Sequence, residues 1–350
     1  MVREAAGRLV TGLARGSPAD WLAALLERVA PWRPGSLAAL TYHRVDEPAA
    51  RPDLLPTLLS ATPASFAAQV AIIADRYRPV SLAEVVEAAR QRTRLPERAV
   101  LVTFDDAYRD FATNAWPILR AAGVPATLFV ATSFADDPRR RFWWDRLWHA
   151  LRTTAREELA LGSGRVLPLV GEADRVLASR ELGARIKSLE HEPAMDEVGR
   201  LLGELGVREA PSGDPAVLGW AELRRLAAEG VTLAAHTRTH PLLDRVSTAR
   251  AVKEIAGSRE DLQREVGPAP AVLAYPAGAA GPAAVESARR AGIALAFTTR
   301  RGGNDVRHAH PLRLRRINVG VRTGRPLVRA QLVWASTVDA RRRRSGSGAW

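Results

Sequence analysis

Short apolar runs alternate with longer amphipathic stretches along most of the chain. The six apolar runs are Leu37–Tyr42, Ala99–Phe104, Ala126–Val130, Val231–Ala235, Ala271–Tyr275 and Ile293–Thr298. Because they are apolar along nearly their whole length, they are typical of strands buried on both faces, as in a parallel sheet.

Helical periodicity marks the stretches between these runs. The predicted helices are Pro63–Arg76, Ser81–Arg92, Asp110–Ala122, Trp220–Glu229, Thr248–Val266 and Pro282–Ala291. Gly123, Gly230 and Gly292 each follow one of them, where glycine commonly ends a helix. Repeated strand–helix units predict an α/β fold, either a barrel or a doubly wound sheet.

One segment, residues 136–218, breaks this rhythm because it contains no convincing strand. Helices are predicted within it at Ala155–Leu161, Ala173–Leu189 and Asp196–Leu205. The segment follows the carboxyl end of a predicted strand, where the loops of α/β barrels form the active face. We therefore expect a helical insertion beside the site; the alternative is a subdomain packed on the far side of the barrel.

The composition is that of a folded protein with a sizeable core, with 47% hydrophobic and 25% charged residues in a chain of 350. The absence of cysteine excludes disulfides, a thiolate zinc site and a cysteine nucleophile. Residues 1–36 read as a helical segment in which charged residues interrupt any leader-like apolar run. We expect the protein in the cytoplasm or at the membrane periphery.

Positive charge gathers at the C-terminal end. Residues 300–350 hold 13 arginines against Asp305 and Asp339, within a chain of net charge +13. A bias of the genome towards arginine explains this, since the chain has only two lysines, Lys187 and Lys253. The other explanation is that an Arg-rich tail, residues 321–350, contacts an anionic membrane surface; nucleic acid is the less favoured partner.

Polar clusters directly follow four of the predicted strands. Asp105 and Asp106 end the second apolar run, and His236 and His240 follow the fourth. His43 follows the first run, and Tyr275 ends the fifth. Because loops at the carboxyl ends of strands converge in α/β folds, these residues are expected to meet.

The two histidines and one aspartate form a plausible ligand set. The spacing of His236 and His240 predicts both imidazoles on one side of a helical turn. Two histidines and a carboxylate suit Zn²⁺, Co²⁺, Ni²⁺ or Fe²⁺, and the second carboxylate is then free to take a proton from water. The alternative is that the histidines and aspartates only cap helices.

The sequences TFDDAYRDF, PATLFV, HTRTHP, AYPAG and AFTTRRGG occur in this order between residues 38 and 319. They resemble the polysaccharide deacetylase family, the NodB-homology or carbohydrate esterase family 4 group. The resemblance implies a distorted (β/α)7 barrel over residues 37–320 and metal-dependent removal of N-acyl groups from amino sugars. It also implies that Asp105 is the catalytic base and that Asp106, His236 and His240 hold the metal, most simply Zn²⁺. The backbone N–H of Tyr275 would face the oxyanion.

Two motifs depart from the usual family pattern. Many members have Arg-Pro-Pro where this chain has Ala274-Tyr275-Pro276, as in a branch linked to exopolysaccharide, so Asp105 needs another orienting partner. Many also have a late Leu-His pair that supplies a general acid. His308 and His310 lie near that place, and we take His310 as the general acid, the alternative being surface histidines in a basic loop.

The aromatic run that opens the insertion contains Trp143, Trp144 and Trp148, which either stack on sugar rings or anchor helix packing. The expected substrate is an N-acetylated amino sugar of a polysaccharide or a glycolipid precursor. Two other functions remain open: a catalytically inactive carbohydrate-binding barrel, and a protein that binds anionic surfaces through its Arg-rich tail.

Overall fold

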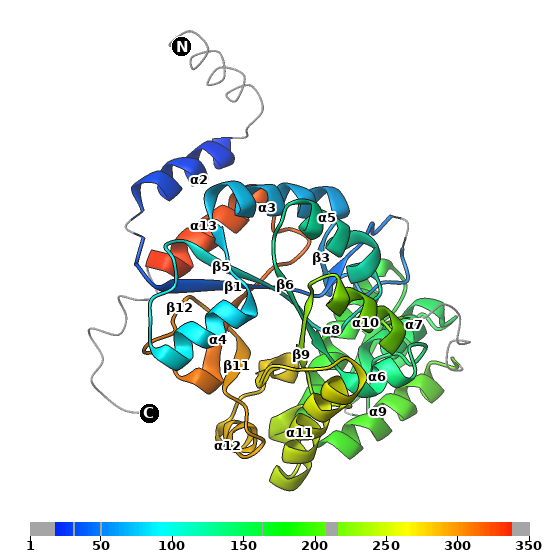
Figure 1. Ribbon diagram of the computed structural model, residues 1–350. Helices are drawn as coiled ribbons and strands as arrows, with labels where there is room; N and C mark the ends of the chain where they lie inside the picture. Colours follow the sequence, from blue (N-terminus) through cyan, green and yellow to red (C-terminus); the bar gives the residue numbers. More distant parts are fainter. Residues whose placement is uncertain (1–17, 31, 50, 163, 208–215, 338–350) are drawn as a thin grey trace, which may run out of the picture.

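The computed structural model describes residues 18–337 except 31, 50, 163 and 208–215, and its centre is a closed barrel of seven parallel strands (Figure 1). In order around the barrel these are β1 (Ser36–Tyr42), β5 (Ala99–Phe104), β6 (Ala126–Val130), β9 (Thr232–Ala235), β10 (Val272–Ala274), β11 (Leu295–Arg301) and β13 (Leu314–Asn318). Pairing of β1 with β5 closes the ring, from Leu37 opposite Ala99 to Tyr42 opposite Phe104. The predicted α/β barrel is confirmed, and it is the (β/α)7 form.

Helices surround the barrel at the predicted places. They are α3 (Pro63–Arg76), α4 (Leu82–Gln91), α5 (Trp116–Ala121), α10 (Trp220–Ala228), α11 (Thr248–Glu265) and α12 (Pro282–Arg290). A short π-helix, Phe111–Ala115, precedes α5. Local sequence explains where helices begin: Thr62 caps α3 by accepting a hydrogen bond from the Ser65 N–H, and Ser81 forms a capping box with Glu84 at α4.

The seventh strand, β13, was not among the predicted strands. It lies between β1 and β11, with Leu40 of β1 opposite Ile317. Short strands extend the sheet: β4 (Arg78–Pro79) pairs with β5, and β12 (Asn304–Asp305) runs antiparallel to β1. Two further short strands, β2 (Arg44–Val45) and β3 (Leu59–Ala61), pair with each other.

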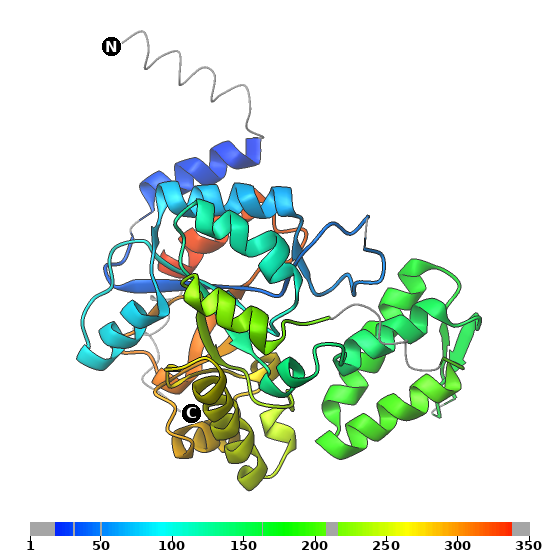
Figure 2. The ribbon, with the colours of Figure 1, turned by 45° about the vertical axis from the view of Figure 1, so that its right-hand side comes forward.

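The insertion forms a lobe of its own at one side of the barrel (Figure 2). Its elements are α6 (Thr132–Asp136), α7 (Trp143–Thr153), β7 (Glu158–Ala160), β8 (Val166–Pro168), α8 (Glu172–Ser188) and α9 (His191–Glu204). Leucines, alanines and other apolar residues between Leu147 and Leu205 build a core separate from those of the barrel.

One predicted helix of the insertion is wrong. Ala155–Leu161 contains strand β7, which pairs antiparallel with β8, Leu159 facing Leu167. Both strands bury only their central residue, so the side chains alternate with the period of a strand. The helix predicted at Ala173–Leu189 matches α8 within one residue, whereas α9 begins five residues before the predicted Asp196 and α7 was not predicted.

The folded part of the chain extends beyond residue 321, where the Arg-rich tail was expected to begin. Helix α13 (Arg325–Thr337) packs against α2 (Pro18–Val29) and α3, and an ion pair joins Arg329 to the buried Glu27. Arg341–Arg344, the most basic part of the tail, lie outside the described residues. Among the residues that the structure describes, no helix combines the length and apolar character needed to cross a membrane.

Candidate active site

Asp106, His236 and His240 converge at the carboxyl ends of β5 and β9. The Asp106 Oδ1 atom lies 3.4 Å from His236 Nε2 and 3.3 Å from His240 Nε2, and one ligand atom of each residue lies within 4.8 Å of the others. Ligands about 2.1 Å from a tetrahedral ion are roughly 3.4 Å apart, so these distances match a closed ligand set. Asp106 Oδ1 is buried and has no hydrogen-bond partner, which a cation would satisfy. These residues therefore fit a divalent metal.

Both imidazoles direct Nε2 towards the carboxylate of Asp106. His236 Nδ1 donates to the carbonyl oxygen of Ala274 over 2.7 Å, which leaves Nε2 as the acceptor facing Asp106. Burial lowers the pKa of His240 to about 3, so its ring is neutral at physiological pH. Neutral imidazole is the form that binds metals.

The two histidines do not lie on a helical turn, contrary to the sequence prediction. The segment from His236 to His240 is a loop in which Thr237 has φ 65° and His240 has φ 58°. Glu254 of α11 holds this loop by accepting hydrogen bonds from the N–H groups of Arg238 and Thr239, at 3.0 and 2.8 Å. The ring centroids of the histidines are 4.8 Å apart.

Backbone strain gathers at the site. Of the seven non-glycine residues with positive φ in the described chain, five lie in the three polar motifs: Asp106, Ala107, Thr237, His240 and Ala277. Left-handed backbone costs such residues of the order of 1 kcal/mol each, and it persists where surrounding structure enforces it. The barrel therefore fixes the directions of these side chains against their local preference.

Asp105 is held by an arginine that the sequence analysis did not identify. The guanidinium of Arg316, on β13, donates to both carboxylate oxygens of Asp105 at 2.7 Å each, and its Nε donates to the Thr298 carbonyl. Both side chains are almost fully buried. Burial alone would raise the pKa of Asp105, but the charge and hydrogen bonds of Arg316 outweigh it, and the pKa is lowered. Asp105 is therefore an ionised carboxylate in a fixed orientation.

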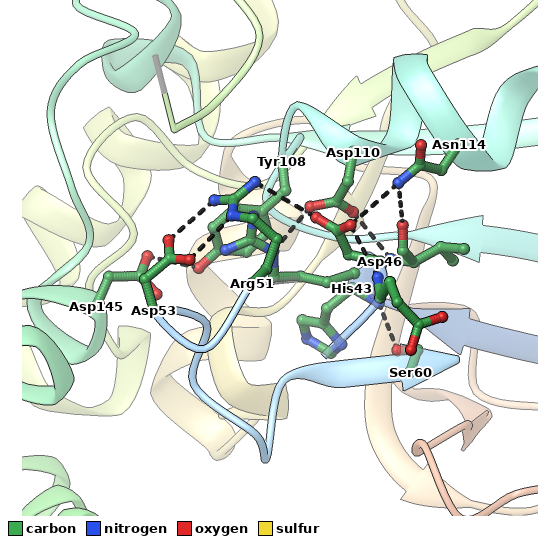
Figure 3. A network of polar contacts seen from close by, with 12 residues as sticks. His43, Asp46, Arg51, Asp53, Ser60, Tyr108, Asp110, Asn114 and Asp145 are labelled. Atoms are coloured by element: carbon green, nitrogen blue, oxygen red, sulfur yellow. Dashed lines mark hydrogen bonds and ion pairs between the residues drawn. The ribbon is translucent and has the colours of Figure 1, made fainter. Parts of the chain in front are cut away.

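The loop that carries His43 is tied down by the helical segment after β5 (Figure 3). Asp110 accepts hydrogen bonds from the Arg44 side chain at 2.8 Å and from the Val45 N–H at 2.9 Å. The backbone N–H of His43 itself donates to the Ser60 hydroxyl. These contacts place His43 at the end of β1, in the wall of the same cavity as Asp105 and Asp106.

Two sequence predictions for catalytic groups need correction. The Tyr275 N–H donates to the Phe297 carbonyl at 3.0 Å as part of the β10–β11 pairing, so it is not free to face an oxyanion. The His310 side chain is exposed and its Nδ1 accepts from the Leu312 N–H, while His308 is exposed beside Asp305. Neither His308 nor His310 lines the cavity.

A cavity of about 340 Å³ lies over these groups, within the size range of small-ligand sites. Its floor, as we name it, is Asp105, Asp106, His236 and His240 at the strand ends. Its insertion wall is formed by residues that come mostly from the insertion: Arg140, Arg141, Trp143, Trp144, Arg146, Ile186, Lys187, Leu189, His191 and Met195. The insertion thus stands beside the candidate metal centre, as predicted.

The tryptophans of the insertion differ in whether they line the cavity. Trp143 and Trp144 line the cavity, and the Trp144 ring lies 4.9 Å from that of His240 in an edge-to-face arrangement. Trp148 is buried and does not line the cavity.

A parallel seven-stranded barrel with an Asp–His–His set at its strand ends defines the class of the protein. The sequence model for polysaccharide deacetylase matches residues 92–296, and the chain belongs to the polysaccharide deacetylase family. It is 34% identical over 152 residues to the poly-β-1,6-N-acetyl-D-glucosamine N-deacetylase of Escherichia coli O157:H7, covering 41% of this chain and 22% of that protein. The corresponding protein of Escherichia coli K12 is 34% identical over 139 residues, and this chain spans about a fifth of the length of both relatives.

Solved structures show the same fold at low sequence identity. The Streptococcus pyogenes deacetylase PplD, in complex with acetate, has a TM-score of 0.58 and 19% identity over 86% of this chain and 99% of that one. IcaB from Ammonifex degensii has a TM-score of 0.54 and 19% identity over 85% of this chain and 97% of that one.

Proposed function

We propose that this protein is a metal-dependent hydrolase that removes N-acetyl, or other N-acyl, groups from amino sugars of a polysaccharide or glycolipid precursor. One observation carries the proposal: a buried Asp106–His236–His240 set with an unsatisfied carboxylate oxygen, beside a second carboxylate locked by Arg316. Its family membership supports the same reaction.

Each residue of the floor has a role in this reaction. Asp106, His236 and His240 would hold the ion, with Zn²⁺ preferred and Co²⁺, Ni²⁺ or Fe²⁺ as alternatives. When bound, the ion supplies Lewis acidity for the attack of water on the amide carbonyl. Asp105, kept ionised and oriented by Arg316, accepts the proton of that water.

Two further groups are assigned from their place in the cavity. His43 replaces His310 as the general acid that protonates the leaving amine, because it lines the cavity and His310 does not. Ala277 replaces Tyr275 as the backbone donor to the oxyanion, because it lines the cavity in a left-handed turn directly after the Tyr275-Pro276 pair.

The test is acetate release from a panel of N-acetylated sugars with the purified chain and defined metals. We expect activity to disappear with a chelator and to return with Zn²⁺ or Co²⁺. Activity that resists exhaustive chelation would contradict the proposal, as would a metal-loaded protein that binds the sugars and releases no acetate.

The contact of the Arg-rich tail with anionic membranes stays a proposal of its own. Removing residues 338–350 should weaken binding to phosphatidylglycerol vesicles, with a stronger effect at low salt, and leave acetate release intact. Equal vesicle binding by the full and shortened chains would contradict it.

A further inference from the structure

The cavity outside its floor is lined by cations. Arg140 and Arg141 precede α7, Arg146 belongs to it, and Lys187 lies in the last turn of α8. Arg245 and Arg250 add two more from the barrel side, in the segment after the His236–His240 loop. The carboxylates that line the same cavity are Asp105 and Asp106.

This excess of cations is not what the arginine-rich composition predicts. The chain has 38 acidic residues for 51 basic ones, so about three carboxylates should accompany every four cations. Other arginines of this region are paired with carboxylates: Arg250 at the cavity edge pairs with Glu192, and Arg185 and Arg200 share Glu197. The cavity does not follow the ratio of the whole chain, because the carboxylates in its lining are the two of the floor, Asp105 and Asp106.

Three of the lining cations form no ion pair with a carboxylate among the described residues: Arg140, Lys187 and Arg245. Arg140 lies over the Phe134 ring instead, at 4.7 Å from its centroid. Burial lowers the pKa of Lys187, and the negative charge of Asp106 opposes that shift. These cations are thus left to interact with something that enters the cavity.

The first turn of α9 reinforces the positive character of this wall. His191 and Ala194 of that turn and the following Met195 line the cavity, and Glu190 at the N-cap makes no side-chain hydrogen bond to the helix. The amino end of a helix carries a partial positive charge that favours anions. Glu192 in the same turn is neutralised by Arg250.

We propose that the insertion wall, together with Arg245, binds a phosphate group attached to the acylated amino sugar. The inference rests on the proposed deacetylation and names its substrate class: a sugar phosphate or diphosphate conjugate in preference to a neutral polymer. Guanidinium and ammonium groups are the side chains that recognise phosphate. The phosphate source is either a soluble nucleotide sugar or a lipid-linked sugar.

Binding can be measured without turnover, because Trp143 and Trp144 line the cavity and report on its contents. We expect N-acetylglucosamine 1-phosphate to change the tryptophan fluorescence with at least tenfold higher affinity than N-acetylglucosamine, and the difference should shrink as salt is raised. Equal affinities at low salt would overturn the inference.

The chain offers a matched pair of variants in its only two lysines, Lys187 in the wall and Lys253 on the outer face of α11. Lys187→Gln should reduce the ratio of the two affinities about tenfold, the loss expected for one charge-assisted contact. Arg245→Gln should act in the same direction, and Lys253→Gln should leave the ratio as it is. If the ratio of the two affinities were the same in all three variants and in the parent protein, the inference would also be overturned. Thermal unfolding checks that each variant is folded.

Parallel acetate assays separate this inference from the proposed function. Tight binding of the phosphate sugar by a metal-loaded protein that releases no acetate would contradict the deacetylation and support the phosphate site. Acetate release with equal kcat/KM for neutral and phosphorylated sugars would support the deacetylation and contradict the phosphate site. A polyprenyl diphosphate conjugate in micelles, compared with uridine diphosphate N-acetylglucosamine, identifies the source by the larger kcat/KM.

Discussion

The floor and the insertion wall line the same cavity and differ in how firmly other residues hold their charged side chains. The floor consists of buried side chains held by ion pairs, hydrogen bonds and left-handed backbone, as in the Asp105–Arg316 pair. The wall carries cations such as Lys187 and Arg140, which form no ion pair with a carboxylate in the part of the chain that the structure describes. Catalysis needs side chains that are held in fixed orientations, whereas recognition of a diffusely charged group needs only side chains of the opposite charge.

The two regions also have separate cores and meet at a narrow seam. The insertion packs around its own apolar cluster, while the floor stands on the barrel. At the seam the Tyr108 hydroxyl donates to Asp145 and accepts from the Trp144 indole, both at 2.8 Å. Tyr108 also forms a β-bridge to Val217, where the insertion returns. Changes to the floor should therefore act on chemistry, and changes to the wall on selectivity.

The largest expected effect comes from Asp106→Asn in the floor. The amide is a weaker ligand than the carboxylate, so metal content and acetate release should both fall to the level of a chelated sample. Metal analysis and the acetate assay on the same preparation measure this, with Asp75→Asn on the exposed face of α3 as control. Retention of stoichiometric metal by Asp106→Asn would remove this residue from the ligand set.

Asp105→Asn should separate proton transfer from metal binding. The ion stays because the three ligands are intact, but the water loses its proton acceptor, and kcat should fall about 10²–10⁴-fold. Metal content and kcat are compared with those of the parent protein. Near-normal kcat with metal bound would place the base elsewhere.

Arg316→Lys tests whether orientation of Asp105 matters. Lysine keeps the charge but cannot donate to both carboxylate oxygens in a planar fork, so kcat should fall roughly tenfold to a hundredfold while KM changes little. Arg316→Met would leave a buried carboxylate without its counterion and should lower the free energy of unfolding by about 3–5 kcal/mol. A parallel rise in KM for Arg316→Lys would indicate a binding role instead.

The smallest effect concerns the seam between floor and wall. Burial raises the pKa of Asp145 to about 6, so the folded protein favours the protonated carboxyl. The contribution of Asp145 to the free energy of unfolding is therefore lost as the pH rises from about 4 through 6. Asp145→Asn keeps the acceptor for Tyr108 and does not ionise. Its free energy of unfolding relative to the parent should therefore increase by about 1–2 kcal/mol between pH 4.5 and pH 7.5, measured by urea unfolding. An unchanged difference would show that Asp145 is as ionised in the folded protein as in the unfolded chain.

The alternation of apolar runs and amphipathic stretches was enough to predict six barrel strands and their helices, because each forms from local sequence. The strand β13 escaped notice because arginines interrupt it, and the one that is fully buried, Arg316, owes its burial to Asp105 more than 200 residues away. An arginine among apolar residues in a short strand-like run was the signal that could have found it.

Site residues divide in the same way. The motifs place Asp105, Asp106, His236 and His240 at strand ends, and the fold brings them together. The predicted role of the Tyr275 N–H failed because motif matching does not reveal which backbone groups the sheet uses, and here Phe297 accepts that hydrogen bond. Similarly, only the barrel decides that His43, and not His310, reaches the cavity.

The position of β13 between β1 and β11 has a consequence for the synthesis of the protein. The residues matched by the family, 92–296, exclude both β1 and β13 and end two residues into β11, so a fragment cut at those limits would leave open sheet edges at β5 and at the truncated β11. In the growing chain β1 already pairs with β5, and the sheet stays open between β1 and β11 until β13, the strand that supplies Arg316, has been made. Closure of the barrel and completion of the Asp105–Arg316 pair therefore depend on the same strand, the last of the seven in chain order.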